Sequence, residues 1–296
     1  MNVESFLYER KILIDAGLEK ILPPEDTFPA SIHKALRHSV IDGGKRIRPI
    51  LTLTANELIG GDYRSIIPFA CGIELIHTYS LIHDDLPAMD NSDFRRGKLS
   101  CHKAFGETIA LLAGDALLTL AFQVMSDPVL YETHHPLSIV KAIHVIAQAA
   151  GLQGMVAGQT IDIETQGKSF DLPLLEYIHT HKTGALILAA IKAGAILGEA
   201  TEEELEALIK YGKMVGLAFQ ITDDVLDVMS SRQTLGKQTA ADSMLGKATY
   251  PGLLGLKEAQ KRIRELTQSA EQALSLFGPK AEPLKQIARF LAERTK

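Results

Sequence analysis

Apolar residues recur every three to four positions along most of the chain, whereas the alternation of apolar and polar residues that is typical of strands is nearly absent. One apolar row follows intervals of four residues from 112 to 124, and a second runs from 263 to 277 beside charged residues. Thr201, with Glu204 three residues later, forms a capping box that marks the start of another helix. The pattern predicts an all-α fold.

Turn-forming residues interrupt the helical pattern only briefly. The breaks fall at residues 23–29, 60–62, 127–128, 134–136, 167–168, 172–173 and 278–279. None of them resembles a flexible linker rich in Pro, Ser or Gly, and no repeat of fixed period is present. We therefore expect a single domain over residues 1–296.

The composition is that of a folded, mildly acidic protein. Of the 296 residues, 46% are apolar and 23% are charged, which excludes a chain that stays disordered for lack of hydrophobic groups. The chain has 31 Lys and Arg against 36 Asp and Glu, a net charge of −5, so we expect no nucleic-acid partner. Any anion-binding site must be local.

Two cysteines, Cys71 and Cys101, form no CxxC pair, so the chain predicts neither a disulfide framework nor a zinc site, and we expect a cytoplasmic protein. The first eleven residues carry four charges and no apolar core of a signal peptide. Residues 142–161 lack Asp, Glu, Lys and Arg, but they include His144, three glutamines and three glycines. We therefore expect a buried core helix there and no membrane span.

A first aspartate cluster ends the apolar pattern of residues 69–82. Asp84 and Asp85 project from the last helical turn, and Pro87 disfavours continuation of the helix, so we expect Asp90 to return toward them. Acids in apolar surroundings need a counter-charge, because an unpaired buried carboxylate costs several kcal/mol. A hard divalent cation is one such counter-charge.

A second aspartate cluster contains Asp223, Asp224 and Asp227, on a helical pattern that starts near residue 211. Asp223 and Asp227 lie four residues apart and so point in the same direction. If the two clusters oppose each other across a helical bundle, they supply oxygen ligands for Mg²⁺ that bridges to phosphate. For either cluster alone, a solvated helix end is an equally good interpretation.

Basic residues complement the two acidic clusters. In Gly43-Gly44-Lys45-Arg46-Ile47-Arg48-Pro49, the proline indicates a helix start, so Lys45 and Arg48 lie near a positive dipole end where an oxyanion binds readily. The spacing is not that of a Walker A loop, and a common turn is the alternative. Further cations occur at 95–96, 182, 237 and 247. Substrate phosphates would explain both signs of charge.

Taken together, these residues resemble the trans-isoprenyl diphosphate synthases, most closely the bacterial farnesyl diphosphate synthases, over nearly the whole chain. The resemblance rests on Gly-Gly-Lys-Arg at 43–46, Asp84-Asp85-x4-Asp90 with Arg95-Arg96, Lys182-Thr183-Gly184, Phe219-Gln220 before Asp223-Asp224-x2-Asp227, and Lys237 and Lys247. It implies an isoprenoid synthase fold, which is a helical bundle around a central cavity, and a homodimer.

The resemblance also implies residue roles. Mg²⁺, as three ions per active site with substrate bound, would be held by Asp84, Asp90 and Asp223, and Asp85 would complete the catalytic carboxylates. The diphosphate of dimethylallyl or geranyl diphosphate would be clamped by Arg95, Lys182 and Lys237, and isopentenyl diphosphate would bind to Lys45, Arg48, His77 and Arg96. Thr183 and Gln220 would orient dipoles toward the allylic cation, and Lys247 would add to the substrate-binding set. Such a reaction requires no protein nucleophile, in agreement with the lack of a nucleophile elbow.

Product length is the finer question. Tyr79 lies five residues before Asp84, about 7.5 Å along a helix, where a growing hydrocarbon tail would point away from the metal. An aromatic residue here, combined with the two extra residues Pro87-Ala88, implies by the same resemblance a farnesyl product. If Tyr79 only packs in the core, the limit is set elsewhere, for example by Thr78 or Ser80 and the facing helix. A geranylgeranyl product formed by the same chemistry is the alternative.

Two other classes share part of this pattern. Terpene cyclases also use an aspartate-rich helix end, but their second metal motif usually mixes Asn, Ser or Thr, and Glu. Regulatory subunits of prenyl synthases typically lose part of one aspartate motif, and both motifs are complete here. Finally, we expect the glycine-containing segment 230–247 to form a mobile cover over the phosphates.

Overall fold

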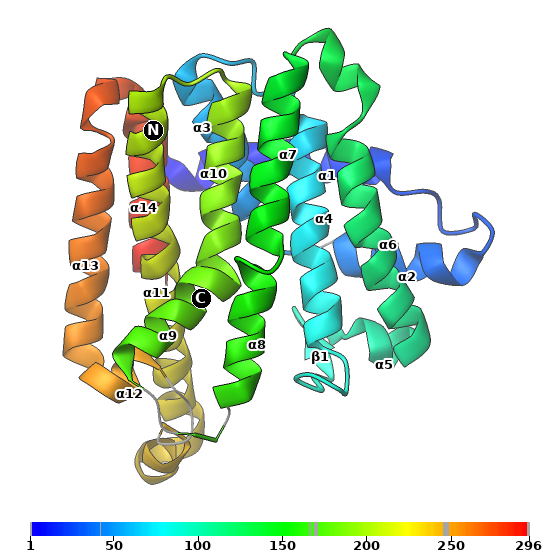
Figure 1. Cartoon of the computed structure of the whole chain (residues 1–296). Coiled ribbons are helices and arrows are strands. Elements are labelled where there is room, and N and C mark those ends of the chain that lie inside the picture. The colour runs from blue at the N-terminus through cyan, green and yellow to red at the C-terminus, as the bar shows by residue number, and fades with distance from the viewer. Residues whose placement is uncertain (1, 42, 166, 169–170, 245–248, 295–296) are drawn as a thin grey trace. The chain divides into compact units, whose positions relative to one another are not determined.

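The computed structural model of the chain is almost entirely helical, which confirms the prediction of an all-α fold (Figure 1). It describes residues 2–41, 43–165, 167–168, 171–244 and 249–294, and for 230–244 the backbone only. Within these residues the sheet structure consists of one hairpin, β1 (Phe94–Arg95) and β2 (Lys98–Leu99). In this hairpin Phe94 pairs with Leu99, and Arg95 pairs with Lys98.

The helices fall into two compact units. The N-terminal unit comprises Asn2–His144 with Ile196–Glu199, and the C-terminal unit comprises Val145–Ala195 with Ala200–Lys296. A single domain over residues 1–296, and aspartate clusters that oppose each other, stay predictions.

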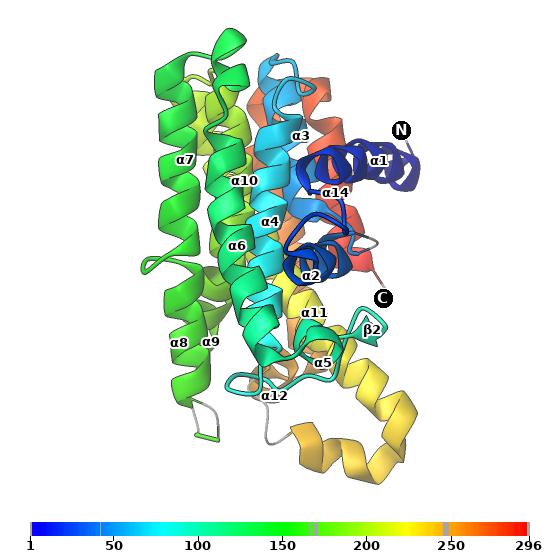
Figure 2. The ribbon, with the colours of Figure 1, turned by 90° about the vertical axis from the view of Figure 1, so that its right-hand side faces the viewer.

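In the N-terminal unit, α4 (Ile67–Asp84) forms the centre and packs against α6, α3 and α1 (Figure 2). Apolar residues cover nearly the whole circumference of α4, and a helix of that kind is stable only when it is buried on all sides. The other elements of the unit are α1 (Val3–Ile21), α2 (Ala30–Val40), α3 (Ile47–Ile59), α5 (Cys101–Phe105), α6 (Glu107–Met125), the 3₁₀ helix η1 (Pro128–Glu132) and the start of α7 (Pro136–Ala150).

In the C-terminal unit, α11 (Glu202–Met244) packs against α13, the π-helix η2 and α14. Its start follows the capping box, because the backbone N–H of Thr201 donates to the Glu204 carboxylate at 2.8 Å and that of Glu204 donates to the Thr201 hydroxyl at 3.3 Å. The remaining elements are α8 (Met155–Thr165), α9 (Leu172–Ile178), η2 (His179–Gly184), α10 (Ala185–Leu197), α12 (Tyr250–Leu254), α13 (Leu256–Ala273), the 3₁₀ helix η3 (Ser275–Ala281) and α14 (Glu282–Glu293).

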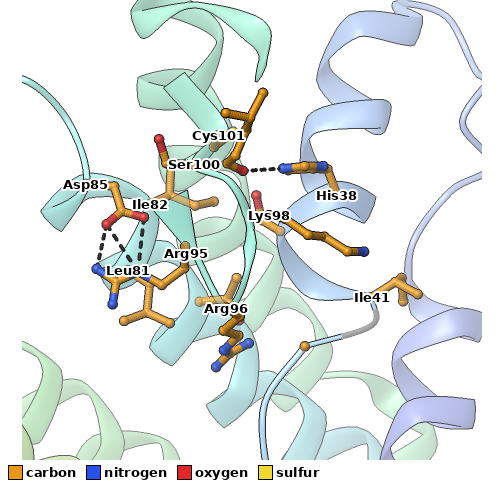
Figure 3. A pocket seen from close by; sticks show the side chains of 14 residues that line it. His38, Ile41, Leu81, Ile82, Asp85, Arg95, Arg96, Lys98, Ser100 and Cys101 are labelled. Carbon is orange, nitrogen blue, oxygen red and sulfur yellow. Dashed lines mark hydrogen bonds and ion pairs between the residues drawn. The ribbon is translucent and has the colours of Figure 1, made fainter. Parts of the chain in front are cut away.

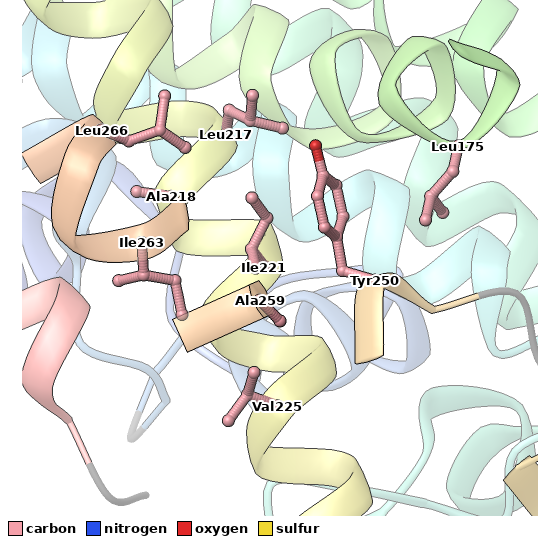
Figure 4. Close-up of a cluster of buried hydrophobic side chains, with 9 residues drawn as sticks. All are labelled: Leu175, Leu217, Ala218, Ile221, Val225, Tyr250, Ala259, Ile263 and Leu266. Carbon is pink, nitrogen blue, oxygen red and sulfur yellow. The ribbon is translucent and has the colours of Figure 1, made fainter. Parts of the chain in front are cut away.

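A hydrophobic cluster joins α9, α11, α12 and α13 within this unit (Figure 4). Tyr250, which is 1% exposed, belongs to this cluster and brings α12 against α11. The cluster consists of Leu175, Leu217, Ala218, Ile221, Val225, Tyr250, Ala259, Ile263 and Leu266. It anchors the chain directly after residues 245–248 to the helix that carries the second aspartate cluster.

The prediction that residues 142–161 form one buried core helix is wrong. The helical pattern breaks between α7 and α8, and Leu152 and Val156 are exposed. Gly154 permits the break, since a Cβ atom at this position would lie 2.0 Å from the carbonyl oxygen of Ala149, a separation that only glycine allows.

Two stretches, Glu107–Glu132 and Pro136–Thr165, are long and apolar enough to cross a membrane by length and composition alone. In each, 39% of the most apolar window is buried. Core helices of soluble proteins pass the same test, so these two stretches are weak evidence for a membrane span.

Candidate active site

The first aspartate cluster closes on itself as the sequence predicts. Asp84 is the last residue of α4, and its carbonyl oxygen accepts a hydrogen bond of 2.9 Å from the backbone N–H of Asp90. The N–H of Ser92 donates to the carbonyl of Asp85 at 3.2 Å. These bonds fold the chain back after Pro87, so that the half-buried Asp84 and the exposed Asp90 belong to one tight loop.

Asp85 has a different environment from Asp84. Its side chain is 3% exposed, and its two carboxylate oxygens accept hydrogen bonds from Nε of Arg95 at 3.1 and 3.2 Å (Figure 3). This hydrogen bonding to Asp85 outweighs burial and raises the pKa of Arg95. Asp85 therefore fixes Arg95 of the hairpin at the end of α4, while its predicted catalytic role stays a prediction.

A small cavity of about 40 Å³ lies beside this ion pair (Figure 3). Its lining includes Asp85, Arg95, Arg96 and Thr78, and the buried hydroxyl of Thr78 has no hydrogen-bond partner within the described part of the chain. The volume suffices for one or two water molecules and is too small for a substrate.

The predicted basic loop precedes α3, with Lys45 exposed and Arg48 half-buried in the first helical turn. Gly43 and Gly44 lie directly against the guanidinium group of Arg96. A Cβ atom at Gly43 would lie 2.5 Å from one terminal nitrogen of Arg96, and a Cβ atom at Gly44 would lie 2.6 Å from the other. The glycine pair therefore provides the space for Arg96, and the three predicted cations lie around one loop.

His77 stands among these cations. Burial lowers its pKa well below the usual 6.5, and the positive charges of Arg48 and Arg96 lower it further. The imidazole is therefore neutral at neutral pH. The charges of several arginines near a neutral histidine favour an anion at this place, because the anion would relieve the repulsion among the cations.

The two predicted chain-length residues lie on the same helix. Tyr79 is 8% exposed, and its ring meets that of His83 edge to face, with centroids 5.7 Å apart. Burial and the charge of Asp84 raise the pKa of Tyr79, so its hydroxyl stays protonated. The hydroxyl of Ser80 donates to the carbonyl of His77 at 2.9 Å.

The second aspartate cluster lies on α11 of the C-terminal unit. A carboxylate oxygen of Asp223 accepts a hydrogen bond from Arg294 at 2.5 Å, and the amide of Gln220 lies 3.4 Å from the other oxygen. Burial raises the pKa of Asp223 against the opposing effect of Arg294. Asp227, one helical turn later, is exposed.

Asp224 is held by residues from two other elements of the C-terminal unit. One of its oxygens lies 2.9 Å from Nε2 of His179 and also accepts a hydrogen bond of 2.9 Å from the backbone N–H of Tyr250. The phenol of Tyr250 in turn donates to Glu176. The middle carboxylate of this cluster thus ties three elements of the unit together, an arrangement that sequence reasoning missed because its partners are 26 and 45 residues away.

Lys182 and Thr183 lie in the π-helix η2, a rare conformation that often marks functional sites. Nζ of Lys182 pairs with Asp162 of α8 at 2.6 Å. Gly158 allows the two helices to meet, since a Cβ atom there would lie 2.1 Å from the backbone nitrogen of Lys182. The spacing Gly158-x3-Asp162, which puts both residues on one helical face, is the sequence signal that points to this contact.

Lys237 and Lys247, together with the predicted cover over residues 230–247, lie outside the residues whose side chains the structure describes. Their roles stay predictions.

The residues fit a magnesium site of a particular kind. Among the residues that the structure describes, no group of three or more His, Cys, Asp or Glu side chains converges on one point. In the N-terminal unit, the loop that follows α4 offers the carboxylates of Asp84 and Asp90. Mg²⁺ commonly binds through one or two carboxylates and completes its shell with water and substrate phosphate, so this donor set fits the ion together with a diphosphate.

Comparison with known proteins agrees with the sequence motifs and with the fold. The polyprenyl synthetase family matches residues 29–277. Geranylgeranyl pyrophosphate synthase 11 of Arabidopsis thaliana is 45% identical over 297 residues, covering 99% of this chain and 82% of that protein. The dimethylallyltranstransferase of Fischerella ambigua is 43% identical over 296 residues, covering 99% and 84%.

A solved structure gives the same result. The FPP/GFPP synthase of Zymomonas mobilis, crystallised in its apo form, has a TM-score of 0.87 and 38% identity and covers 98% of this chain and 99% of that one. The resemblance drawn from the aspartate and lysine motifs, and the isoprenoid synthase fold that it implied, are thereby confirmed. The chain belongs to the polyprenyl synthetase family, whose members are prenyltransferases that act on isoprenoid diphosphates and generally depend on Mg²⁺.

Proposed function

We propose that the protein condenses isopentenyl diphosphate with dimethylallyl diphosphate, and then with geranyl diphosphate, to give (2E,6E)-farnesyl diphosphate and inorganic diphosphate. The observation that carries this proposal is the distribution of charge along α4. Carboxylates suited to Mg²⁺ lie at its end, and the cation-flanked His77 lies seven residues earlier, about 10 Å along the helix. The distance of about 10 Å suits two neighbouring diphosphates, one bound through metal ions at the aspartates and one bound without metal near His77.

The allylic diphosphate belongs to the aspartate end. Asp84 and Asp90, with Asp223 from the second cluster, would hold three Mg²⁺ ions per active site when substrate is bound. Bound Mg²⁺ supplies neutralisation of the charge that develops on the departing diphosphate. Arg95, fixed by Asp85, and Lys182, fixed by Asp162, would hold the same group together with Lys237.

Isopentenyl diphosphate belongs to the basic loop, where Lys45, Arg48, Arg96 and the neutral His77 would hold its diphosphate, and Lys247 adds a further cation. The allylic carbon–oxygen bond breaks, the alkene of isopentenyl diphosphate forms the new carbon–carbon bond, and a proton leaves to the released diphosphate. Thr183 and Gln220 would direct their dipoles at the cation. No side chain has to act as a nucleophile.

The fifteen-carbon product rests on Tyr79, a buried ring five residues before Asp84. A geranylgeranyl product is the alternative, since the Arabidopsis relative carries that name and the Zymomonas protein is named an FPP/GFPP synthase. The chemistry is identical in both, and only the depth of the pocket for the tail differs.

We further propose that the protein works in the cytoplasm as a homodimer. Leu111 and Leu112 on α6, and Leu137 and Val140 on α7, are all about half exposed, and a second copy of the chain would cover them. Both cysteines are buried and free, as suits a reducing compartment.

The test is incubation of the purified protein with labelled isopentenyl diphosphate, geranyl diphosphate and Mg²⁺, with EDTA as the control, followed by dephosphorylation and chromatography of the alcohols. A metal-dependent fifteen-carbon alcohol supports the proposal. A twenty-carbon alcohol would keep the reaction and reject the assigned product. Cyclic hydrocarbons, or no condensation at all, would favour the terpene cyclase or the regulatory subunit instead.

A further inference from the structure

Arg46 is the least expected residue of the basic loop. Its side chain is 1% exposed, although the residue lies between the exposed Lys45 and the half-buried Arg48. Its backbone adopts a left-handed conformation, with φ of 54°, that residues other than glycine rarely adopt. A buried charge on a strained backbone persists only where the surrounding structure holds it firmly.

Three helices provide that hold. Nε of Arg46 donates to Asp15 of α1 at 2.8 Å, and its two terminal nitrogens donate to Glu74 of α4 at 2.9 Å and to the carbonyl of Val40, the last residue of α2, at 2.6 Å. Burial acts to lower the pKa of Arg46, but Glu74 and Asp15 outweigh it, so the guanidinium stays charged. One side chain thus pins the loop to α1, α2 and α4.

The contact with Glu74 sets the register of the loop against α4. Glu74 is 1% exposed and has no role in the proposed chemistry. It lies three residues before His77, so the two side chains share one face of the helix. The pair Arg46–Glu74 therefore brings the loop that carries Lys45 and Arg48 to the face of α4 that carries His77.

We propose that Arg46 and Glu74, with Asp15, are positioning residues for the isopentenyl diphosphate site. They touch no substrate. Their ion pair fixes the distance between the cations of the loop and His77, and it keeps Gly43 and Gly44 against the guanidinium of Arg96. This inference rests on the proposed function, because it assigns the anion held by these residues to isopentenyl diphosphate.

The effect expected from this geometry is selective. Glu74→Gln keeps an oxygen acceptor but removes the charge, and Arg46→Lys removes the forked hydrogen bonding. In both variants KM for isopentenyl diphosphate should rise about tenfold or more, while KM for geranyl diphosphate and kcat change less than about threefold. A merely structural role would lower stability without separating the two KM values.

A matched control exists in the same unit. Arg10 is 7% exposed, pairs with Glu57 at 2.5 Å and lies over the ring of Tyr63 at 3.5 Å, so it is another buried arginine held by an ion pair. Arg10→Lys should lower the melting temperature and leave KM for isopentenyl diphosphate unchanged. If Arg46→Lys does not fold, Asp15→Asn removes a partner whose side chain is one-third exposed and gives the same readout more mildly.

The experiment measures both KM values for the four proteins and, by calorimetry in EDTA, the affinity for isopentenyl diphosphate alone. The proposal predicts weaker binding in Glu74→Gln than in wild type and no change in Arg10→Lys. Equal rises in both KM values, or the same loss of affinity in Arg10→Lys, would overturn it. A wild-type protein that binds isopentenyl diphosphate but condenses nothing would instead overturn the proposed function and leave the calorimetric comparison to decide the positioning role.

Discussion

Gly158→Ala tests whether the position of Lys182 matters for activity apart from its effect on the stability of the fold. Gly158 lies where α8 touches the π-helix η2, and a Cβ atom there would lie 2.1 Å from the backbone nitrogen of Lys182 and 2.7 Å from its Cα atom. Both atoms belong to the backbone, so no rotamer change can relieve the clash. The helices themselves have to separate.

The magnitude follows from the distances. Ordinary contact begins at about 3.4 Å, so the two backbones must move apart by about 1.3 Å. Overpacking of this kind costs about 1–3 kcal/mol in the free energy of unfolding. A displacement of about 1 Å in a group that holds the substrate lowers the rate about 100-fold. We therefore expect kcat/KM for geranyl diphosphate to fall about 100-fold, with a modest fall in melting temperature.

Gly212→Ala is the matched control. A Cβ atom at Gly212 would also clash, at 2.8 Å from Leu188 and 3.1 Å from Ile191, but both contacts are the ends of flexible side chains. This variant should lose less stability than Gly158→Ala, because the two side chains can move, and it should keep its activity. The assays are thermal unfolding and steady-state condensation, both measured with the two variants side by side. Equal activity in Gly158→Ala and Gly212→Ala would contradict the predicted displacement of Lys182.

Three further predictions concern the two units separately. Tyr79→Ala should lengthen the product beyond fifteen carbons, as read by chromatography of the alcohols, and unchanged length would remove Tyr79 as the floor of the pocket. Asp224→Asn should lower the free energy of unfolding by about 1–3 kcal/mol in thermal melts, because it weakens the part-buried hydrogen bond to the histidine that begins η2. The pKa of His77 in the native protein lies well below 6.5, so below about pH 6.5 the unfolded chain binds a proton there and the native chain does not. The free energy of unfolding therefore falls as the pH drops below about 6.5. His77→Gln should flatten this acid limb in denaturant titrations at several pH values, and identical limbs would contradict the shift.

The sequence was sufficient where local chemistry decides the structure. The helical period, the capping box at Thr201, the end of α4 before Pro87 and the return of Asp90 all depend on residues within a few positions of one another. Long-range motifs also identified the family, because two aspartate clusters in a fixed order with the same cations are a specific combination.

The sequence did not reveal which of two neighbouring aspartates is buried and paired, because tertiary contacts decide this. Asp84 and Asp85 are neighbours of the same type, yet only Asp85 is buried against Arg95. Asp223 and Asp224 differ likewise, since only Asp224 contacts His179, a residue 45 positions away in the chain. No periodicity reveals such a partner, because the packing of one helix on another sets it.

The buried helix expected over residues 142–161 failed for a related reason. Low charge predicts burial on average, but here it reflects an apolar surface that stays exposed in the single chain. The break at Gly154 depends on a backbone contact with Ala149, which the count of charged residues does not register.

We propose that the aspartate clusters hold Mg²⁺ for a diphosphate that leaves during condensation. The most direct measurement is the condensation rate as a function of Mg²⁺ concentration for wild type, Asp84→Asn and Asp223→Asn, with circular dichroism and melting temperature as checks on the fold. We expect the condensation rate to fall about a thousandfold or more in each variant, with the helical signal retained. A rate near that of wild type in either variant, at the same Mg²⁺ requirement, would contradict the proposed metal role of that aspartate.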